Sequence, residues 1–242
     1  MRILTPNAKY FLDVRDDIPD EKDRRDSQQV VKEAWVENVY QIHSGDFTNE
    51  KPIFVDLGAN IGAVSLQVAS FNDYRETPIK IYAIEPELRN LAVLKSNIEL
   101  NGKTDDIVVI EKAVTGSKPM IPWYMTNQGG NSHLTSTDNG SNPVELVTLE
   151  ELLDSEGIIE CDVLKVDIEG GEYLVLAEAS FDTLRRIKYL ALEFTGSGDV
   201  NDDPLEREAS AFERLVGRLA EVFNLHVIGR PSTGGYIYGR RY

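Results

Sequence analysis

The segment from Phe54 to Ala69 constrains the fold more than any other, because it joins an apolar run, an acid, a glycine-bearing turn and a helical pattern. The run Ile53–Val55 predicts a buried strand. Gly58 and Gly62 follow it, at positions where backbone without a side chain can approach a ligand closely. The helix after the turn supplies free amide groups at its first residues. This order of strand, turn and helix predicts an α/β fold with a ligand at the carboxyl end of the strand.

The spacing of the glycines in the turn indicates which class of ligand the turn binds. Residues 56–62 read Asp-Leu-Gly-Ala-Asn-Ile-Gly and lack the middle glycine of the dinucleotide pattern Gly-x-Gly-x-x-Gly. A pyrophosphate presses on that turn and requires the extra glycine, whereas S-adenosylmethionine (SAM) carries no phosphate and presents an amino acid end. A carboxylate can meet that ammonium directly or through water. The turn therefore predicts a SAM site, with an ordinary strand-to-helix turn as the alternative; the residues concerned are Asp56, Gly58, Asn60 and Gly62.

A second strand is predicted from Ile79 to Ile84, with Glu85 and Pro86 directly after it. A carboxylate at this place, about 20 residues beyond the glycine turn, is suited to accept both hydroxyls of a ribose. The alternative is that Glu85 favours the positive N-terminus of the helix that follows, and both roles are compatible. A third strand is predicted over 107–110, and Ala113 after it is expected to border the adenine ring.

Acids gather at the end of a later strand. Val163–Val166 predicts a strand, and Asp167, Glu169 and Glu172 follow within six residues of it. Like charges so close destabilise one another unless a cation, hydrogen bonds or a pKa shift compensates, and such crowding is typical of functional sites. Alternatively, Glu169 and Glu172 favour the start of the next helix. A further strand over 189–194 carries Glu193 in an apolar run, where an acid requires a partner.

Together these motifs resemble the FkbM-type methyltransferases, which are Rossmann-like class I enzymes that use SAM. The resemblance covers about residues 53–194 and is carried by VDLGANIG (55–62), IEP (84–86) with Asn97 and Asn101 after it, VTLEELL (147–153), and LKVDIEGGEYLVL (164–176) with LALEF (190–194). It implies a three-layer α/β/α sandwich whose seven-stranded, mostly parallel sheet has the order 3-2-1-4-5-7-6, with strand seven antiparallel. It also implies methyl transfer, usually to a hydroxyl of a sugar or polyketide.

The acid cluster supplies the candidates for catalysis. Methyl transfer requires that the acceptor be held close to the methyl group and that its proton be taken up. Asp167 is the first candidate for base or acceptor positioning, and it also borders the expected cofactor; Glu169 and Glu193 come next. His133 is an alternative base with a suitable intrinsic pKa. Clustered carboxylates also suit a divalent cation, but none is expected and no metal ligand is assigned.

The chain is predicted to form one α/β domain over residues 51–242, long enough for a sizeable core. Residues 1–50 form an N-terminal extension, expected to be helical and packed on the core, with Asp26 or Ser27 as a helix cap. Trp35 in that helix has the spacing of a packing residue. Residues 116–143 are rich in Gly, Ser, Asn, Thr and Pro and are predicted to be a long loop or hairpin insertion.

Charge and composition limit the classes of partner that the protein is expected to bind. Asp and Glu number 41 against 25 Lys and Arg, a formal net charge of −16, which repels phosphate backbones. We therefore expect a small-molecule hydroxyl acceptor and no nucleic acid. The single cysteine, Cys161, is predicted to be a buried thiol. The absence of a long apolar run and of a signal-peptide pattern predicts a cytoplasmic protein without membrane contact. The oligomeric state is not addressed by these patterns.

Two other functions agree with parts of the pattern. A nicotinamide-dependent oxidoreductase would account for the strand, the glycine turn and Glu85, but not for the missing middle glycine. A non-catalytic SAM-binding module would keep all the cofactor residues. Binding of SAM or of a nicotinamide cofactor, followed by a search for turnover, separates the three.

Overall fold

A computed structural model of the chain describes residues 2–5, 9–14, 28–117, 123–128, 131–136, 143–168, 170–194, 204–230 and 232–242. Within these ranges, the side chains of residues 126–128, 131–133 and 204–210 are outside the description. Of the predicted catalytic candidates, Glu169 and the side chain of His133 therefore lie outside it.

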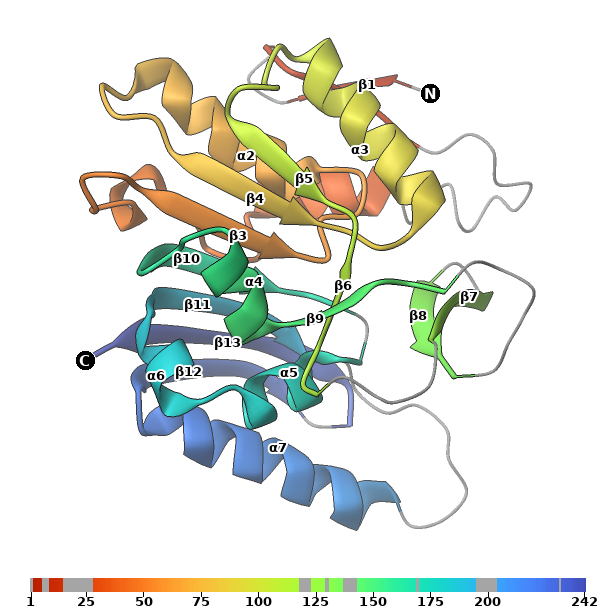
Figure 1. The fold of residues 1–242 in the computed structure, drawn as a ribbon, viewed down its shortest axis with the longest axis vertical. Helices are drawn as coiled ribbons and strands as arrows, with labels where there is room; N and C mark the ends of the chain where they lie inside the picture. Colours follow the sequence, from red (N-terminus) through yellow and green to blue (C-terminus); the bar gives the residue numbers. More distant parts are fainter. Residues whose placement is uncertain are drawn as a thin grey trace.

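Seven strands form one central sheet (Figure 1). Its order in space is β5 (Ile107–Ile110), β4 (Lys80–Ile84), β3 (Ile53–Leu57), β10 (Cys161–Val166), β11 (Ile187–Phe194), β13 (Gly234–Arg241) and β12 (Phe223–Arg230). Strand β13 pairs antiparallel with both of its neighbours, while the pairs from β5 to β11 are parallel. Counted along the chain, this is the order 3-2-1-4-5-7-6 implied by the family resemblance.

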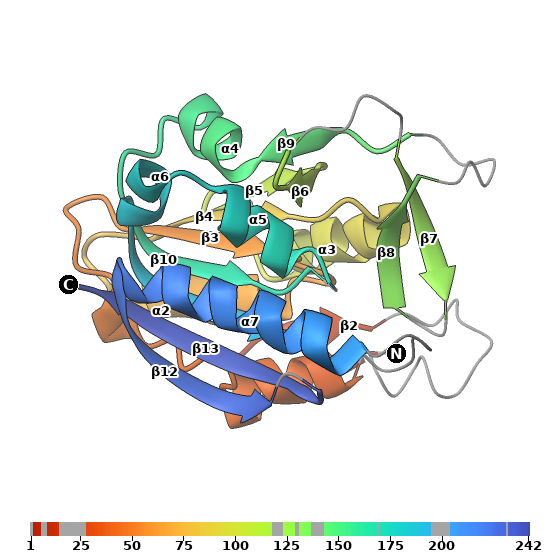
Figure 2. The ribbon, with the colours of Figure 1, turned by 90° about the horizontal axis from the view of Figure 1, so that it is seen from below.

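Helices cover both faces of the sheet (Figure 2). One apolar core joins the sheet to the segment 30–47 and to α2 (Ala63–Phe71) and α3 (Leu88–Leu100). The other core joins it to α4 (Leu149–Ser155), α5 (Glu172–Glu178), α6 (Phe181–Arg185) and α7 (Pro204–Ala220). Successive strand residues serve the two cores in turn, as Phe54 and Val55 do, because side chains alternate along a strand. The predicted three-layer α/β/α sandwich is confirmed, and Cys161 is fully buried in it.

The N-terminal extension is helical only in part, which corrects the prediction. It begins with an antiparallel pair, β1 (Arg2–Leu4) and β2 (Phe11–Asp13). Residues 28–32 are helical and continue into the single π-helical turn η1 (Glu33–Glu37), while the predicted caps at 26 and 27 lie outside the described residues. Trp35 packs on the core, as expected, and its Nε1 donates to the carbonyl of Ala63 at 3.0 Å. Short 3-10 turns, η2 (Ser44–Asp46) and η3 (Asn72–Tyr74), complete this layer.

Two asparagines of α3 bind the backbone of β2 as a neighbouring strand would. Asn97 Oδ1 accepts from the amide of Asp13 at 2.7 Å, and Asn97 Nδ2 donates to the carbonyl of Asp13 at 3.0 Å. Asn101 repeats this pattern with Phe11, at 2.8 and 2.6 Å. Three-residue strands have little stability by themselves. The helix therefore holds the extension in register.

The predicted insertion over 116–143 contains a hairpin. Strand β7 (Tyr124–Gln128) pairs antiparallel with β8 (Asn131–Thr135), and the flanking strands β6 (Ala113–Thr115) and β9 (Leu146–Thr148) pair in parallel. In Figures 1 and 2 the hairpin stands beyond the carboxyl ends of the sheet strands. It lies on the side of the molecule where a ligand of this architecture is expected.

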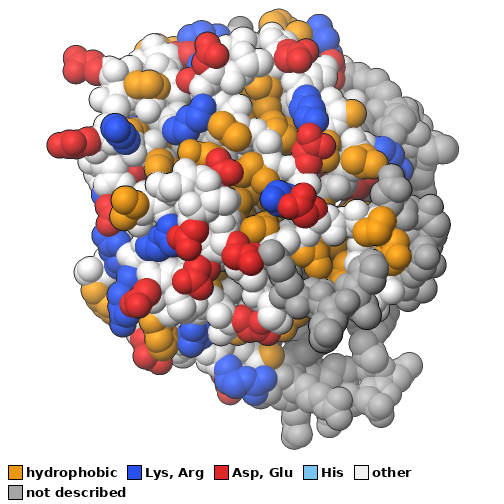
Figure 3. Space-filling view, in the orientation of Figure 1, with side chains coloured by type: hydrophobic (Ala, Val, Ile, Leu, Met, Phe, Trp, Pro, Cys, Tyr) orange, Lys and Arg blue, Asp and Glu red, His pale blue; other side chains and the backbone are white. Residues whose placement is uncertain are grey.

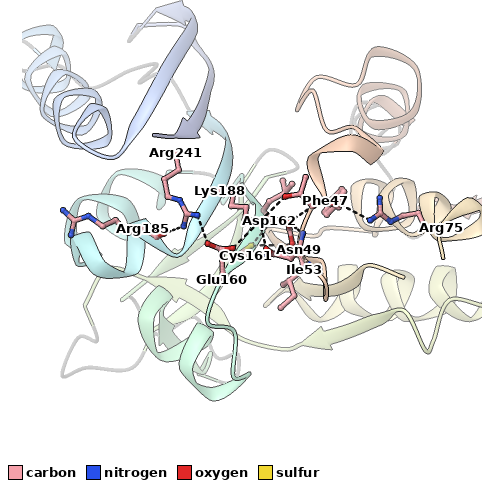
Figure 4. A network of polar contacts seen from close by, with 12 residues as sticks. Phe47, Asn49, Ile53, Arg75, Glu160, Cys161, Asp162, Arg185, Lys188 and Arg241 are labelled. Atoms are coloured by element: carbon pink, nitrogen blue, oxygen red, sulfur yellow. Dashed lines mark hydrogen bonds and ion pairs between the residues drawn. The ribbon is translucent and has the colours of Figure 1, made fainter. Parts of the chain in front are cut away.

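A buried carboxylate at the opposite end of the sheet ties the entering chain to the core (Figure 4). Asp162 Oδ1 accepts from the amides of Thr48 and Asn49, and its Oδ2 accepts from the amide of Ile53, each at 2.9 Å. Lys188 Nζ lies 3.5 Å from Asp162 Oδ1. The segment that precedes β3 is therefore fixed at the amino ends of the strands.

Candidate cofactor and catalytic site

The polar residues of the site lie on one face of the sheet, close to its carboxyl edge. Asp56 of β3 is in register with Lys165 of β10, and Lys165 is in register with Ala191 of β11. Two residues further along β11 is Glu193, which is in register with Tyr236 of β13. Side chains two apart on a strand share a face, so these groups face the layer that contains the N-terminal segment and α2.

A buried ion pair supports the glycine turn. Lys165 Nζ lies 3.1 Å from Asp56 Oδ1 and donates to the carbonyls of Gly58 at 2.7 Å and Leu57 at 3.3 Å. Burial opposes the charge of Lys165, but the carboxylates of Asp56 and Asp167 outweigh it and raise the pKa of Lys165 above its ordinary value. The ammonium is therefore charged at neutral pH.

Asp56 belongs to the ion pair that supports the glycine turn, and it is fully buried. Its Oδ2 accepts from Ser65 Oγ at 2.6 Å, and its Oδ1 makes no regular hydrogen bond and faces the ammonium of Lys165. A part for Asp56 in SAM binding stays a prediction. In this arrangement it would act through the backbone of the turn that Lys165 holds.

Positive φ angles shape the turn itself, at Gly58 (+78°), Asn60 (+51°) and Gly62 (+88°). A Cβ on Gly58 would lie 1.7 Å from the carbonyl oxygen of Asp167, and one on Gly62 would lie 2.6 Å from Leu94 Cδ1. The sequence analysis assigned both glycines to the close approach of a ligand. The structure shows that neighbouring protein atoms already require them.

Glu85 joins the turns that follow β3 and β4. Its Oε2 accepts from the amide of Asn60 at 2.8 Å, and its Oε1 accepts from the amide of Glu87 at 2.9 Å. Burial raises the pKa of Glu85 to about 7, against the effect of these hydrogen bonds. The N-cap of α3 is Glu87, whose side chain accepts from the amide of Asn90 at 2.8 Å. Glu85 thus stands fixed at the end of its strand, and Ala113, after β5, is buried at 4% exposure.

The structure brings two of the predicted catalytic acids together. The hydroxyl of Tyr40 lies 2.7 Å from Asp167 Oδ2 and 2.9 Å from Glu193 Oε2. Asp167 keeps 28% of its side chain exposed, and its Oδ2 lies 3.5 Å from Lys165 Nζ. Burial, followed by the negative charge of Asp167, raises the pKa of Glu193 to about 7. The partner that an acid in an apolar strand requires is therefore Tyr40, together with Asp167.

Comparison with known proteins identifies the fold and the family. A family model described as the methyltransferase FkbM domain matches residues 56–219, more than half of the chain. The chain belongs to the FkbM methyltransferase family. A methyltransferase, sdnD of Sordaria araneosa, is 28% identical over 184 residues, which cover 62% of this chain and 68% of that protein.

Two solved structures share the fold of this FkbM-family protein. The FkbM methyltransferase of Methylobacillus flagellatus KT is 15% identical with a TM-score of 0.52, and the match covers 92% of this chain and 56% of that one. A candidate rRNA methylase of Clostridium thermocellum is 10% identical with a TM-score of 0.50, covering 81% of this chain and 89% of that one. At these identities the likeness concerns the fold alone. The methyltransferase fold implies SAM as the methyl donor, and the family match leaves the nicotinamide alternative without support.

Sequence reasoning missed Tyr40, which belongs to the extension of this FkbM-family chain. The apolar spacing of its neighbours indicated a packing helix, and nothing in that pattern marked a hydroxyl aimed at the site. Glu172, by contrast, follows the alternative given for it, because its carboxylate accepts from the amides of Ile168 at 3.2 Å and Gly170 at 2.9 Å. It stabilises the turn before α5 and takes no part in the acid pair.

Across the residues that the structure describes, no three His, Cys, Asp or Glu side chains are grouped to hold a metal ion. The cation considered from the sequence needed Glu169, which lies outside them. In those same ranges no helix is long and apolar enough to span a bilayer.

Proposed function

We propose that this FkbM-family protein transfers the methyl group of SAM to a hydroxyl of a small molecule, of the sugar, glycoside or polyketide type. One observation carries the proposal. Directly beside the glycine turn, two carboxyl groups share the hydroxyl of Tyr40, and one of them, Glu193, has a pKa of about 7. A pair of carboxyl groups of which one has a pKa near the working pH can hold one proton and still take up the proton that an alcohol loses on methylation.

The cofactor half of the site is formed by the ends of β3 and β4. The carboxylate of Glu85 is fixed there, where it suits ribose hydroxyls, and the turn carries no side chain at residue 58. We assign Asn60, Gly62 and Ala113 to the same half. SAM, when bound, supplies a methyl group on a positively charged sulfur.

The acid half is formed by the ends of β10 and β11. Asp167 is connected to the cofactor half, because its amide donates to the carbonyl of Leu57 at 3.1 Å. Its carboxyl group is partly exposed, so a hydroxyl acceptor can hydrogen-bond to it. As the new carbon–oxygen bond forms, the O–H bond breaks and its proton passes to this acid pair. Holding the acceptor and the methyl group in line is the remaining task of the site.

Two measurements test the proposal in sequence. Isothermal calorimetry with SAM and with its demethylated product should give one site per chain, and a ligand at 100 times its Kd should stabilise the fold by about 2.7 kcal/mol. Small sugars, glycosides and polyketide alcohols are then screened for release of the demethylated product. Absence of heat with both ligands in a folded sample would contradict methyl transfer, and binding without any turnover would favour the non-catalytic module.

Once an acceptor is found, Asp167→Asn tests the acid half. We expect SAM to bind within a few fold of the parent while turnover falls by roughly 10² or more, the usual scale for loss of a general base. Asp182→Asn is the matched control, because this aspartate is 96% exposed on α6 and pairs with Arg185 at 3.0 Å. Full turnover in Asp167→Asn would remove Asp167 from the mechanism.

A further inference from the structure

Tyr40 reaches the centre of the site from a segment outside the matched residues 56–219. We infer that Tyr40 is a positioning residue that holds one proton on Glu193 and keeps Asp167 ionised, so that Asp167 receives the proton of the acceptor. The inference deepens the proposed methyl transfer and rests on it for its catalytic meaning. Its structural content, two protons shared among the Tyr40 hydroxyl and the two carboxyl groups, can be tested separately.

Counting protons around Tyr40 leads to this assignment. Its hydroxyl carries one hydrogen and can donate to one carboxylate only, yet both carboxylate oxygens lie within 2.9 Å of it. Two unprotonated oxygens at that distance would repel each other. A second proton must therefore lie on one of the carboxyl groups, which then donates to the hydroxyl oxygen.

The surroundings decide which carboxyl group holds the second proton. Lys165 Nζ lies 3.5 Å from Asp167 Oδ2 and favours its ionised form. Among the described residues no cation forms an ion pair with Glu193; Lys165 lowers its pKa from farther away, but burial is the largest cause and favours its neutral form. The chain of donors therefore runs from Glu193 to Tyr40 and from Tyr40 to Asp167. This leaves a charged acceptor of protons at the exposed end of the chain.

Charged or titratable groups from several elements interact with the cluster or belong to it. They are Glu33 from η1, Asp56 from β3, Lys165 and Asp167 from β10 and its end, Glu172 from α5, Glu193 from β11, and Tyr236 and Tyr238 from β13. Lys165 also lies 5.2 Å from the centroid of the Tyr40 ring, and Tyr236 meets that ring edge-on at 6.0 Å. Burial and then the charge of Asp167 are among the causes that raise the pKa of Glu33. The acids outnumber Lys165, which favours retention of a proton among them.

The loop around Tyr40 holds its side chain inward at a conformational cost. Asn38 and Gln41 adopt positive φ angles, +46° and +51°, which residues other than glycine rarely adopt. The amide group of Asn38 binds both the N–H and the carbonyl of Ile42 at 3.2 Å, and Tyr189 donates its hydroxyl to the carbonyl of Tyr40 at 3.2 Å. Strained backbone that its surroundings hold in place is typical of functional sites.

The reaction that follows from this arrangement balances. The acceptor's O–H bond breaks as its oxygen bonds to the methyl carbon, and the sulfur–carbon bond breaks with its electron pair left on sulfur. The proton joins Asp167, so the pair holds one proton before transfer and two after it. Asp167 keeps 28% of its side chain exposed and returns the extra proton to water.

The test compares Tyr40→Phe with Tyr189→Phe in the full chain. The first variant removes the bridging hydroxyl and keeps the ring beside Lys165, whereas the second removes a buried hydroxyl that binds the same loop without touching a carboxylate. Side-chain carboxyl groups are titrated by carbon NMR without cofactor. The parent should show Glu85 and Glu193 titrating near pH 7, and only the Glu193 titration should disappear in Glu193→Gln. Because Tyr40 accepts the proton of Glu193 in the proposed chain of donors, Tyr40→Phe should lower the Glu193 titration by about one pH unit, and Tyr189→Phe should leave it in place.

The same variants are then compared in turnover. The acidic limb of the kcat profile should move in Tyr40→Phe and stay in place in Tyr189→Phe, with the Kd for SAM unchanged in both. A Glu193 titration in Tyr40→Phe that is identical to the parent or raised would overturn the inference, and so would a parent that loses no titration near pH 7 in Glu193→Gln. If the titration moves but no acceptor is turned over, the shared proton stands and the proposed methyl transfer fails. If Tyr40→Phe does not fold, the Glu193→Gln titration alone decides whether Glu193 holds the proton.

Discussion

A single methyl group at residue 58 would meet the backbone of another strand. Its Cβ would lie 1.7 Å from the carbonyl oxygen of Asp167, and the φ of +78° is itself unfavourable by about 1–2 kcal/mol for an L residue. Gly102 offers a matched comparison, because its φ is +63° and nothing lies within 4 Å of its Cβ position. The difference between the two sites isolates the collision.

We expect Gly102→Ala to lower the free energy of unfolding by about 1 kcal/mol and Gly58→Ala by about 4 kcal/mol or more. Urea denaturation measures both. SAM binding should also be lost in Gly58→Ala, since the turn would move away from Asp167. An equal loss of stability at the two positions would show that the peptide at Asp167 shifts away from the new Cβ at little energetic cost.

The raised pKa of Glu193 makes stability depend on pH. Its ordinary value is 4.5 and its value in the fold is about 7, so the fold binds this proton more tightly than the unfolded chain does. The stabilisation is complete below pH 4.5 and is lost as the pH rises through 7. Glu193→Gln removes this dependence, while Glu85, with a similar pKa, contributes equally to both proteins.

Between pH 4.5 and 7 the parent should therefore lose stability relative to Glu193→Gln, with a slope that approaches about 1.4 kcal/mol per pH unit midway between the two pKa values and levels off above pH 7. Urea unfolding at a series of pH values measures the difference. Parallel curves for the two proteins would show that Glu193 is ionised throughout this range.

Individual residues of the site could be predicted only in part. An acid in an apolar strand implied that Glu193 has a partner, but the partner, Tyr40, is distant in sequence and left no periodic signal. The same holds for Asp56, whose burial depends on the pairing of β3 with β10. Local patterns indicate that a polar group requires compensation, and the tertiary fold determines which group provides it.

At the scale of elements, the contact between β2 and α3 depends on side-chain amides. Asn97 is fully buried, and besides Asp13 it binds the carbonyl of Ile61 at 2.9 Å. Asn97→Ala would remove the side-chain partner of three backbone groups, two of them partly buried on Asp13 and one buried on Ile61, and a buried group left without a partner costs about 1–3 kcal/mol. Asn101, at the partly exposed end of the helix, makes similar bonds to Phe11 and serves as the control.

Asn97→Ala should lower the free energy of unfolding by about 3 kcal/mol, and Asn101→Ala by about 1 kcal/mol. Amide hydrogen exchange should show the Asp13 N–H losing its protection in the first variant alone. Retained protection of the Asp13 N–H would mean that packing keeps β2 in place without the side-chain amide of Asn97.

Long elements were predictable where short ones were not. The strands β3, β4, β5, β10 and β11 followed from alternation and apolar runs, because each extends over four to eight residues. The pair β1 and β2 has three residues in each strand, too few for a period to emerge. The pair packs against the surface of helix α3, and a strand pattern in the sequence does not predict such a partner.

For the whole molecule, the sheet order was available only through the family resemblance, since alternation does not specify which strands are neighbours. Charge, in contrast, is a property of the entire chain. The net charge is −16, and Figure 3 shows Lys and Arg scattered among Asp and Glu over the described part of one face. Such a surface repels a polyanion most strongly at low ionic strength.

We expect no saturable binding of a structured RNA in fluorescence anisotropy, either at 0.15 M salt, about the physiological value, or at roughly tenfold lower salt. A protein with a hidden basic surface would bind more tightly as the salt is reduced. Binding with that salt dependence would redirect the search for an acceptor from small molecules to nucleic acids.

The recognisable domain and the complete site have different boundaries. Residues 56–219 include the glycine turn, Asp167 and Glu193, but Tyr40 precedes them and Tyr236 follows them. A gene exchange that moved only the shared domain between relatives would transplant both acids and leave their bridging hydroxyl behind. A graft intended to carry this proton arrangement into another scaffold must also include the loop at 38–42 and strand β13, whose Tyr238 donates to the carbonyl of Val39 in that loop. The part of the chain needed to reproduce this site is therefore longer than the matched domain of residues 56–219.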